Sequence, residues 1–403
     1  MKKARLDIKT RQICWNTETV ALPEPPPVRK VRGEGYENLP LYDGQTSGWK
    51  SGRRLLAVQA CECTMSGALV PGSVQVKMGG TRMEPGKDFQ VNEFWGTVGR
   101  LPDGKIIPGE PVRISYSYYP SRIDAVIRKD GKLSVVTGKE GMAHPAIPAI
   151  PGNAVRIANI FWHGDSSKLS SDWLYPVTET AFPAGLLPAP DVLPEKTLRK
   201  LRAGKPVRII AWGDSVTECS YLPKESRWPQ QFCRRLQTRY PDAKIELLTE
   251  GWSGRSTSSF FAVPPGEPHN FEENVLAPKP DLVISEFVND CGLSAENMQA
   301  NYARAEKAFR KIGAEWIILT PHYTRPDWMG LKNTKDCDDD PRPFVKFLRE
   351  FTAAHRIPLA DAARYWGRLY RQGIPYEILY SNGINHPLEY GLSLFADALM
   401  KLF

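Results

Sequence analysis

The 403-residue sequence has no long apolar run and few cysteines. No window comes near the roughly 18 uninterrupted apolar residues that a membrane-spanning helix needs. A secretory signal requires an apolar segment after its basic residues. The opening residues, MKKARLDIKTRQICW, include basic side chains but no such segment. The sequence therefore predicts a chain without a membrane span.

Cysteine is also scarce, and its seven positions are an odd number, which excludes a fully paired disulfide framework. No second Cys or Cys/His cluster follows Cys61 and Cys63, so no metal site is predicted. Reduced cysteines favour a cytoplasmic location. The alternative is a secreted or periplasmic protein whose export signal has been removed.

A concentrated basic tract is missing as well, although the formal net charge is +8. The basic residues are spread along the chain and are not interleaved with aromatic residues, so no nucleic-acid partner is predicted. A mildly cationic surface of this kind would attract acidic polysaccharides. Nothing in the pattern indicates the oligomeric state.

The first half of the chain has the pattern of an all-β domain. Residues 1–50 are predicted to be irregular, and short β-like runs follow, separated by Gly, Pro, Asn and Asp. Asp130-Gly131 predicts a type I′ hairpin, because both residues tolerate positive φ. The predicted runs are Leu55 to Thr64, Ser73 to Met78, Phe89 to Phe94, Val112 to Tyr119, Ile123 to Arg128, Lys132 to Thr137 and Val155 to Trp162. Strands without intervening helices indicate an antiparallel sandwich or jelly roll over residues 1–180.

A proline-rich connector with a short helix is predicted over 181–204, and an α/β domain over 205–403. Its strands are predicted at Val207 to Trp212, Lys244 to Thr249, Asp281 to Glu286, Trp316 to Thr320 and Ile357 to Ala360. Its helices are predicted at Trp228 to Arg239, Ala295 to Ile312, Pro343 to His355 and Gly391 to Leu402. This alternation indicates a parallel sheet with helices on both faces.

The first strand of that domain ends at Gly213-Asp214-Ser215. In a parallel α/β sheet, ligands bind in the crevice beyond the carboxyl ends of the strands. Ser215 is therefore the first candidate nucleophile, although turns often use the same residues without any catalytic role.

Three later segments occur in the order that a serine hydrolase needs: Gly251-Trp252-Ser253-Gly254, Asn289-Asp290 and His386-Pro387. With the serine turn, these four blocks resemble the SGNH hydrolases, or GDSL esterase/lipase family, over about Val207 to Phe403. The resemblance implies a flavodoxin-like, three-layer α/β/α domain with a five-stranded parallel sheet.

The resemblance also implies a role for each matched residue. Ser215 would be the nucleophile and would give the first oxyanion donor from its backbone amide. Gly254 would give a second amide and Asn289 its side-chain amide. His386 would be the general base. This chemistry requires no cofactor and no metal.

Two positions depart from the family pattern. Phe287 replaces the usual glycine two residues before the asparagine, and Gly383 stands where the family has its acid, three residues before the histidine. Three alternatives remain for the group that orients His386. Asn382 or a backbone carbonyl acts as a neutral partner; Asp361 or Glu389 supplies the carboxylate; or the site is weakly active or inactive.

The other residues expected near a substrate are Asp214, Phe287, His322 and Arg325. His322 and Arg325 follow the fourth predicted strand, where they suit either recognition of a sugar or ordinary loop packing. The acidic run from Asp336 to Asp340 lacks the spacing of a calcium loop, so a solvated turn is predicted.

These features predict a serine esterase that acts on a small-molecule or carbohydrate ester through an acyl-serine intermediate, with a carbohydrate O-acetyl esterase as the preferred interpretation. One alternative is a glycan-binding protein with little or no turnover. Another is a lysophospholipase or thioesterase of the same fold.

Overall fold

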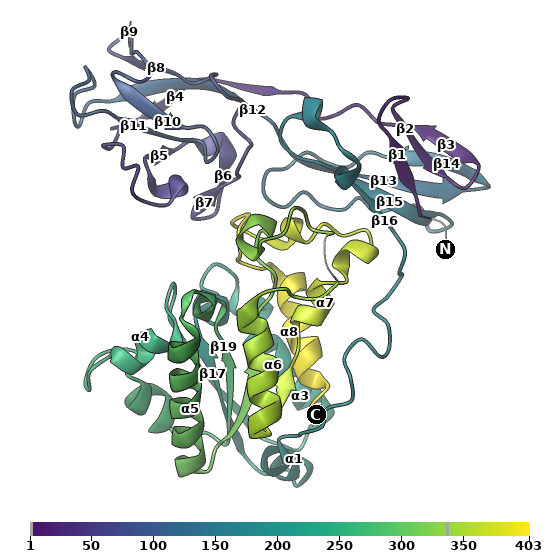
Figure 1. Cartoon of the computed structure of the whole chain (residues 1–403), viewed down its shortest axis with the longest axis vertical. Helices are drawn as coiled ribbons and strands as arrows, with labels where there is room; N and C mark the ends of the chain where they lie inside the picture. The colour runs from purple at the N-terminus through teal and green to yellow at the C-terminus, as the bar shows by residue number, and fades with distance from the viewer. Residues whose placement is uncertain (1–2, 336–337) are drawn as a thin grey trace. The chain divides into compact units, whose positions relative to one another are not determined.

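The computed structural model describes residues 3–335 and 338–403 (Figure 1). The chain forms two compact units. We call the first the β unit: it contains the chain up to Thr180 together with Leu369–Ile384. The second, the α/β unit, contains Ala181–Arg368 and Asn385–Phe403. The segment Leu369–Ile384 is therefore part of the β unit, whereas the sequence pattern places it in the domain over 205–403.

The β unit is built of antiparallel sheets, as predicted. Its strands are β1 Arg5–Asp7, β2 Gln12–Trp15, β3 Glu18–Ala21, β4 Arg29–Tyr36, β5 Arg53–Arg54, β6 Gln59–Ala60, β7 Cys63–Thr64, β8 Gln75–Met78, β9 Thr81–Arg82, β10 Phe89–Asn92, β11 Thr97–Arg100, β12 Val112–Tyr118, β13 Arg122–Lys129, β14 Lys132–Val136, β15 Val155–Trp162 and β16 Leu174–Pro176. Asp130 and Gly131 both have positive φ in the β13–β14 hairpin, as predicted.

Two of these sheets, β4-β12-β8-β9 and β10-β11-β5, form a sandwich around one core. Val76 and Ile114 from the first sheet and Phe89 and Val98 from the second are all fully buried in it. Alternating inward residues on β12 explain this packing, since successive side chains of a strand point to opposite faces. A second core joins β2, β13, β15 and β16.

Two predictions for this unit are wrong. Residues 1–50 contain strands β1 to β4 rather than irregular chain, because these strands carry few buried side chains and their pattern is weak. The predicted strand from Leu55 to Thr64 is broken into a helical turn at Leu56–Val58 and the short strands β6 and β7.

The α/β unit contains one five-stranded parallel sheet with the order β18-β17-β19-β20-β21. Its elements are α1 Glu195–Arg202, β17 Val207–Gly213, α2 Ser215–Glu218, α3 Trp228–Arg239, β18 Ile245–Gly251, α4 Thr257–Ala262, β19 Leu282–Glu286, α5 Ala295–Ile312, β20 Glu315–Leu319, α6 Pro343–His355, β21 Leu359–Ala360, α7 Ala363–Trp366 and α8 Glu389–Met400. This order is flavodoxin-like, and the chain changes direction along the sheet at β17.

Helices form a layer on each side of this sheet (Figure 1). On one side Tyr302 of α5 contacts Phe347 of α6, and on the other Trp228 of α3 contacts Phe395 of α8. Local signals set the helix ends: the Ser294 hydroxyl accepts a hydrogen bond from the Asn297 amide at the start of α5, and Gly313 ends it at φ 78°. Within the described parts of the chain, no helix is long and apolar enough to cross a membrane.

Candidate active site

The serine turn joins β17 directly to α2. Asp214 caps α2, and its carboxylate accepts a hydrogen bond from the Val216 amide at 3.0 Å. Gly213 has no room for a side chain, because a Cβ atom would lie 2.1 Å from the Glu286 carbonyl oxygen. This close approach of β19 fixes the turn, and Ser215 follows it at the carboxyl end of the sheet with 6% of its surface exposed.

The side chains of Ser215 and His386 meet in the α/β unit, although 171 residues separate them in sequence. His386 Nε2 lies 3.1 Å from Ser215 Oγ, within the distance that a general base needs for proton transfer. The imidazole belongs to the loop that leads into α8. The two residues predicted to be nucleophile and base thus lie within hydrogen-bonding distance of each other.

Tyr221 holds the His386 ring from the same unit. The two rings stack with their centroids 4.5 Å apart and their planes at 4°. The Tyr221 hydroxyl donates a hydrogen bond to the Pro387 carbonyl oxygen at 3.1 Å. Burial raises the pKa of Tyr221 well above its usual value, so this donor stays protonated. Tyr221 was not predicted from the sequence, where its only local signal is an aromatic ring six residues after Ser215.

Asn289 lies beside the serine turn, just after β19. Its backbone amide and its side-chain Nδ2 both donate to Asp214 Oδ2, each at 2.9 Å. An amide nitrogen of this kind has two hydrogens, so a second one remains to donate to a ligand. Asp214 is fully buried and fixes the position of the expected oxyanion donor.

The loop that carries Gly254 follows β18 and is tied to the serine turn. The Trp252 amide donates to the Gly213 carbonyl oxygen at 3.0 Å, and the Ser253 amide donates to Glu218 Oε2 at 3.1 Å. Gly254 itself is exposed at φ 72°, and a Cβ atom added to it would meet no described atom within 4 Å. Its backbone is therefore open to a ligand, and only glycine adopts this φ without strain.

Three carboxyl groups are buried around this turn. Burial raises the pKa of Asp214 to about 6, although hydrogen bonds from Val216 and Asn289 oppose the shift. Burial also raises the pKa of Asp290 to about 7 and that of Glu286 well above its usual range, where the nearby Asp214 adds to the effect. His386 interacts electrostatically with Asp214 and lowers the pKa of that carboxyl.

The residues expected to orient His386 have other partners. Asn382 Nδ2 donates to Glu62 Oε1 at 2.8 Å, and Asn382 Oδ1 accepts from the Ile384 amide at 2.9 Å. Asn382 thus closes a turn around Gly383, whose φ is 68°. Glu389 lies in the first turn of α8, where its side chain is exposed and makes no hydrogen bond or ion pair within 3–335 and 338–403.

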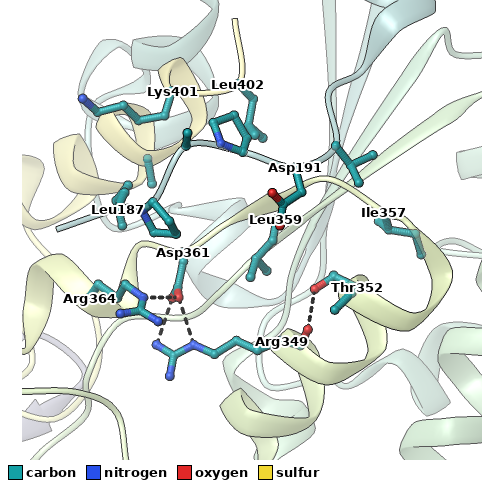
Figure 2. Close-up of a pocket in the computed structure, with 16 residues that line it drawn as sticks. Leu187, Asp191, Arg349, Thr352, Ile357, Leu359, Asp361, Arg364, Lys401 and Leu402 are labelled. Atoms are coloured by element: carbon teal, nitrogen blue, oxygen red, sulfur yellow. Dashed lines mark hydrogen bonds and ion pairs between the residues drawn. The ribbon is translucent and has the colours of Figure 1, made fainter. Parts of the chain in front are cut away.

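Asp361 forms ion pairs instead of contacting the imidazole (Figure 2). Its carboxylate accepts from Arg349 Nε and Arg364 Nε, both at 2.9 Å, and from the Thr320 hydroxyl at 3.1 Å. These contacts lie beside a cavity that the connector around Asp191 helps to line. The two guanidinium groups balance the charge of the Asp361 carboxylate. These contacts indicate that Asp361 stabilises the fold rather than orients His386.

Three residues expected at the substrate are enclosed. His322 is 0% exposed beside the rings of Trp366 and Phe395, and burial lowers its pKa well below the usual value. Arg325 is 7% exposed and pairs with Asp327 at 2.5 Å. Phe287 is buried, and its ring packs 4.8 Å from that of Trp212.

No metal site emerges in the described residues, where no group of three or more His, Cys, Asp or Glu side chains could hold an ion. The acidic run from Asp336 to Asp340 lies partly outside them. Of its described members, Asp340 pairs with Arg342 and Asp339 with Arg349.

No protein-family model matches the chain, and no curated protein matches it either. Several solved structures are similar to about half of it. A two-domain esterase active on acetylated mannans has 16% identity and a TM-score of 0.42, over 52% of this chain and 51% of that one. The chain thus spans about half the length of that esterase.

Two smaller proteins are similar over nearly their whole length. A variant of an acetyl xylan esterase from Geobacillus stearothermophilus has 17% identity and a TM-score of 0.39, over 49% of this chain and 94% of its own. A member of the lipolytic protein G-D-S-L family from Veillonella parvula DSM 2008 has 18% identity and a TM-score of 0.38, over 49% and 97%.

Proposed function

We propose that the α/β unit is a serine ester hydrolase that uses Ser215 as nucleophile and His386 as general base. The observation that carries this proposal is the 3.1 Å distance between Ser215 Oγ and His386 Nε2 at the carboxyl end of a parallel sheet. The donors expected for an oxyanion, Gly254 and Asn289, come from the two loops tied to the same serine turn.

In the first half of the reaction, Ser215 Oγ attacks the ester carbonyl carbon while His386 Nε2 takes the hydroxyl proton. The carbonyl oxygen becomes an oxyanion, which the amides of Ser215 and Gly254 and the side chain of Asn289 stabilise. When the tetrahedral intermediate collapses, the bond to the alcohol oxygen breaks. His386 gives its proton to that oxygen, and an acyl-Ser215 ester remains.

In the second half, water attacks the acyl carbon while His386 takes one of its protons. The acid is released, and the proton returns to Ser215. Tyr221 holds the plane of the imidazole ring. This arrangement substitutes for the acid that the chain lacks at Gly383.

For the substrate, we infer a carbohydrate O-acetyl ester. The sequence blocks resemble the GDSL esterase/lipase family, and Trp328, in the loop after β20, exposes 48% of its surface. An exposed indole of this kind suits contact with the apolar face of a sugar ring. Acetate release from acetylated xylan and acetylated mannan tests this substrate class.

The test of the reaction is hydrolysis of p-nitrophenyl acetate by the wild type and by Ser215→Ala and His386→Ala. We expect both variants to lose at least about 10³-fold in kcat. A wild type without turnover above the Ser215→Ala background on p-nitrophenyl and sugar acetates would refute the enzyme and favour a glycan-binding protein. Full activity of Ser215→Ala would show that another residue is the nucleophile.

A further inference from the structure

The chain leaves the α/β unit after Arg368 and returns to it at Asn385, one residue before the catalytic histidine. The intervening segment, Leu369–Ile384, belongs to the β unit. It contains helical turns at Leu369–Arg371 and Tyr376–Leu379, and Tyr376 and Tyr380 within it are fully buried. The loop that carries His386 therefore starts from a segment built into the other unit.

The beginning of this segment is bonded to the strands of the β unit. The Arg371 carbonyl oxygen accepts hydrogen bonds from the amides of Thr178 at 2.7 Å and Glu179 at 3.0 Å. The Gly373 carbonyl oxygen accepts from Asn159 Nδ2 at 2.6 Å, and Asn159 lies on β15. These bonds join the segment to β15 and to the residues that follow β16. The first part of the segment is therefore held in the β unit by hydrogen bonds.

The end of the segment is held by a hydrogen bond, by apolar packing and by a close backbone approach. Glu62, in the turn between β6 and β7, accepts the hydrogen bond from Asn382 at 2.8 Å. Ile384 is 1% exposed and packs with Cys63 and Trp95. Gly383 passes Met65 so closely that a Cβ atom would lie 2.4 Å from its sulfur. Three consecutive residues are thus held by the β6–β7 hairpin and its neighbours.

His386 follows Ile384 by two residues, and two residues span at most about 7 Å. Ordering of Ile384 therefore limits the conformations open to the backbone that carries the imidazole. Catalytic groups tolerate displacement poorly, because a misplacement of about 1 Å costs about 100-fold in rate. On its other side the loop is fixed by Tyr221, through Pro387.

We propose that Glu62 is a positioning residue for catalysis: it fixes Asn382 and, with the buried Ile384, restricts the backbone that leads to His386 two residues later. This inference rests on the proposed function. The effect acts through the histidine loop and not through binding of carbohydrate, so it extends to substrates that contain no sugar.

The experiment compares Glu62→Ala, Glu62→Gln and the control Glu140→Ala in the full chain. Glu140 is an exposed β-unit carboxylate that binds Arg29 at 2.8 Å, away from this segment. With p-nitrophenyl acetate, Glu62→Ala is expected to lose about tenfold in kcat with KM unchanged. Glu62→Gln recovers most of this loss because its amide oxygen still accepts from Asn382, and Glu140→Ala matches the wild type.

A second readout does not depend on turnover. Hydrogen exchange followed by mass spectrometry is expected to show faster exchange in peptides covering 383–388 for Glu62→Ala, and not for Glu140→Ala. Unchanged kcat and unchanged exchange in Glu62→Ala would overturn the positioning role. If the wild type cleaves no ester, the proposed function fails on its own, and the exchange result still decides whether Glu62 orders the histidine loop.

Discussion

The ring of Tyr221 lies face to face with the imidazole of His386, with centroids 4.5 Å apart and planes at 4°. Its hydroxyl also bonds the carbonyl oxygen of Pro387, the next residue. In a Ser-His-Asp triad the acid fixes the orientation of the imidazole. Here a stacked ring and a backbone hydrogen bond fix it, while the position of the family's acid is occupied by Gly383.

The first prediction concerns this ring. Tyr221→Ala is expected to lower kcat by about 100-fold with little change in KM, because the imidazole loses its stacking partner and swings away from Ser215. Tyr221→Phe keeps the stack and loses only the bond to Pro387, so its loss stays below about tenfold. Steady-state kinetics with p-nitrophenyl acetate measure both.

Tyr240→Phe is the matched control, since it removes a similar bond from a tyrosine hydroxyl to a backbone carbonyl, that of Phe403 at 2.7 Å. It is expected to keep the wild-type kcat. Equal kcat for Tyr221→Ala and the wild type would show that stacking does not orient the base.

The second prediction concerns the oxyanion. Asn289→Ala is expected to lower kcat by about 10²–10³-fold and to leave KM nearly unchanged, because its side chain donates to charge that develops in the transition state. Asn301→Ala is the control: its Nδ2 bonds the hydroxyls of Thr257 and Ser258 in α4. A loss in Asn289→Ala that appears in KM alone would assign the residue to ground-state binding.

The sequence alone predicted the α/β unit well. The bounds of α3, α5 and α6 agree with the predicted helices, because their amphipathic spacing and their caps are local signals. Ser215 and Asn289 follow predicted parallel strands, so their position at one edge of the sheet was expected. His386 precedes the last helix, and only the family resemblance placed it at the same site.

Long-range contacts explain what the sequence did not predict. Tyr221 acts on Pro387, 166 residues away, and no local pattern reports such a contact. The position of His322 after the fourth predicted strand suited either sugar recognition or loop packing, and its ring is enclosed. The segment Leu369–Ile384 has ordinary helical turns, and only its tertiary contacts assign it to the β unit.

The third prediction separates the carboxylate of Asp361 from catalysis. Asp361→Asn is expected to lower the free energy of unfolding by about 2 kcal/mol, because Arg349 and Arg364 lose charge-assisted hydrogen bonds. Its kcat on p-nitrophenyl acetate is expected to equal that of the wild type at a temperature where both are folded. Urea unfolding and kinetics test the two parts, and a kcat at least tenfold lower with normal stability would instead support a catalytic role for this acid.

The last prediction concerns stability and pH. Burial and the nearby Asp214 raise the pKa of Glu286 well above its usual range, while Arg342 opposes the shift and Asp290 adds to it. Above the unfolded value of about 4.3, the folded chain keeps a proton that the unfolded chain has released. Stability therefore falls as pH rises through this window, by up to about 1.4 kcal/mol per pH unit for this group.

Glu286→Gln removes this proton equilibrium without changing the shape of the side chain. Relative to the wild type it is expected to be equally stable at pH 4 and more stable at pH 8, as measured by urea unfolding at each pH. Glu246→Gln is the control. Glu246 is an exposed side chain of β18 that pairs with Arg208, and its substitution should give no gain in stability at pH 8. If the unfolding free energies of Glu286→Gln and the wild type differ by the same amount at every pH from 4 to 8, Glu286 is already ionised in the folded chain.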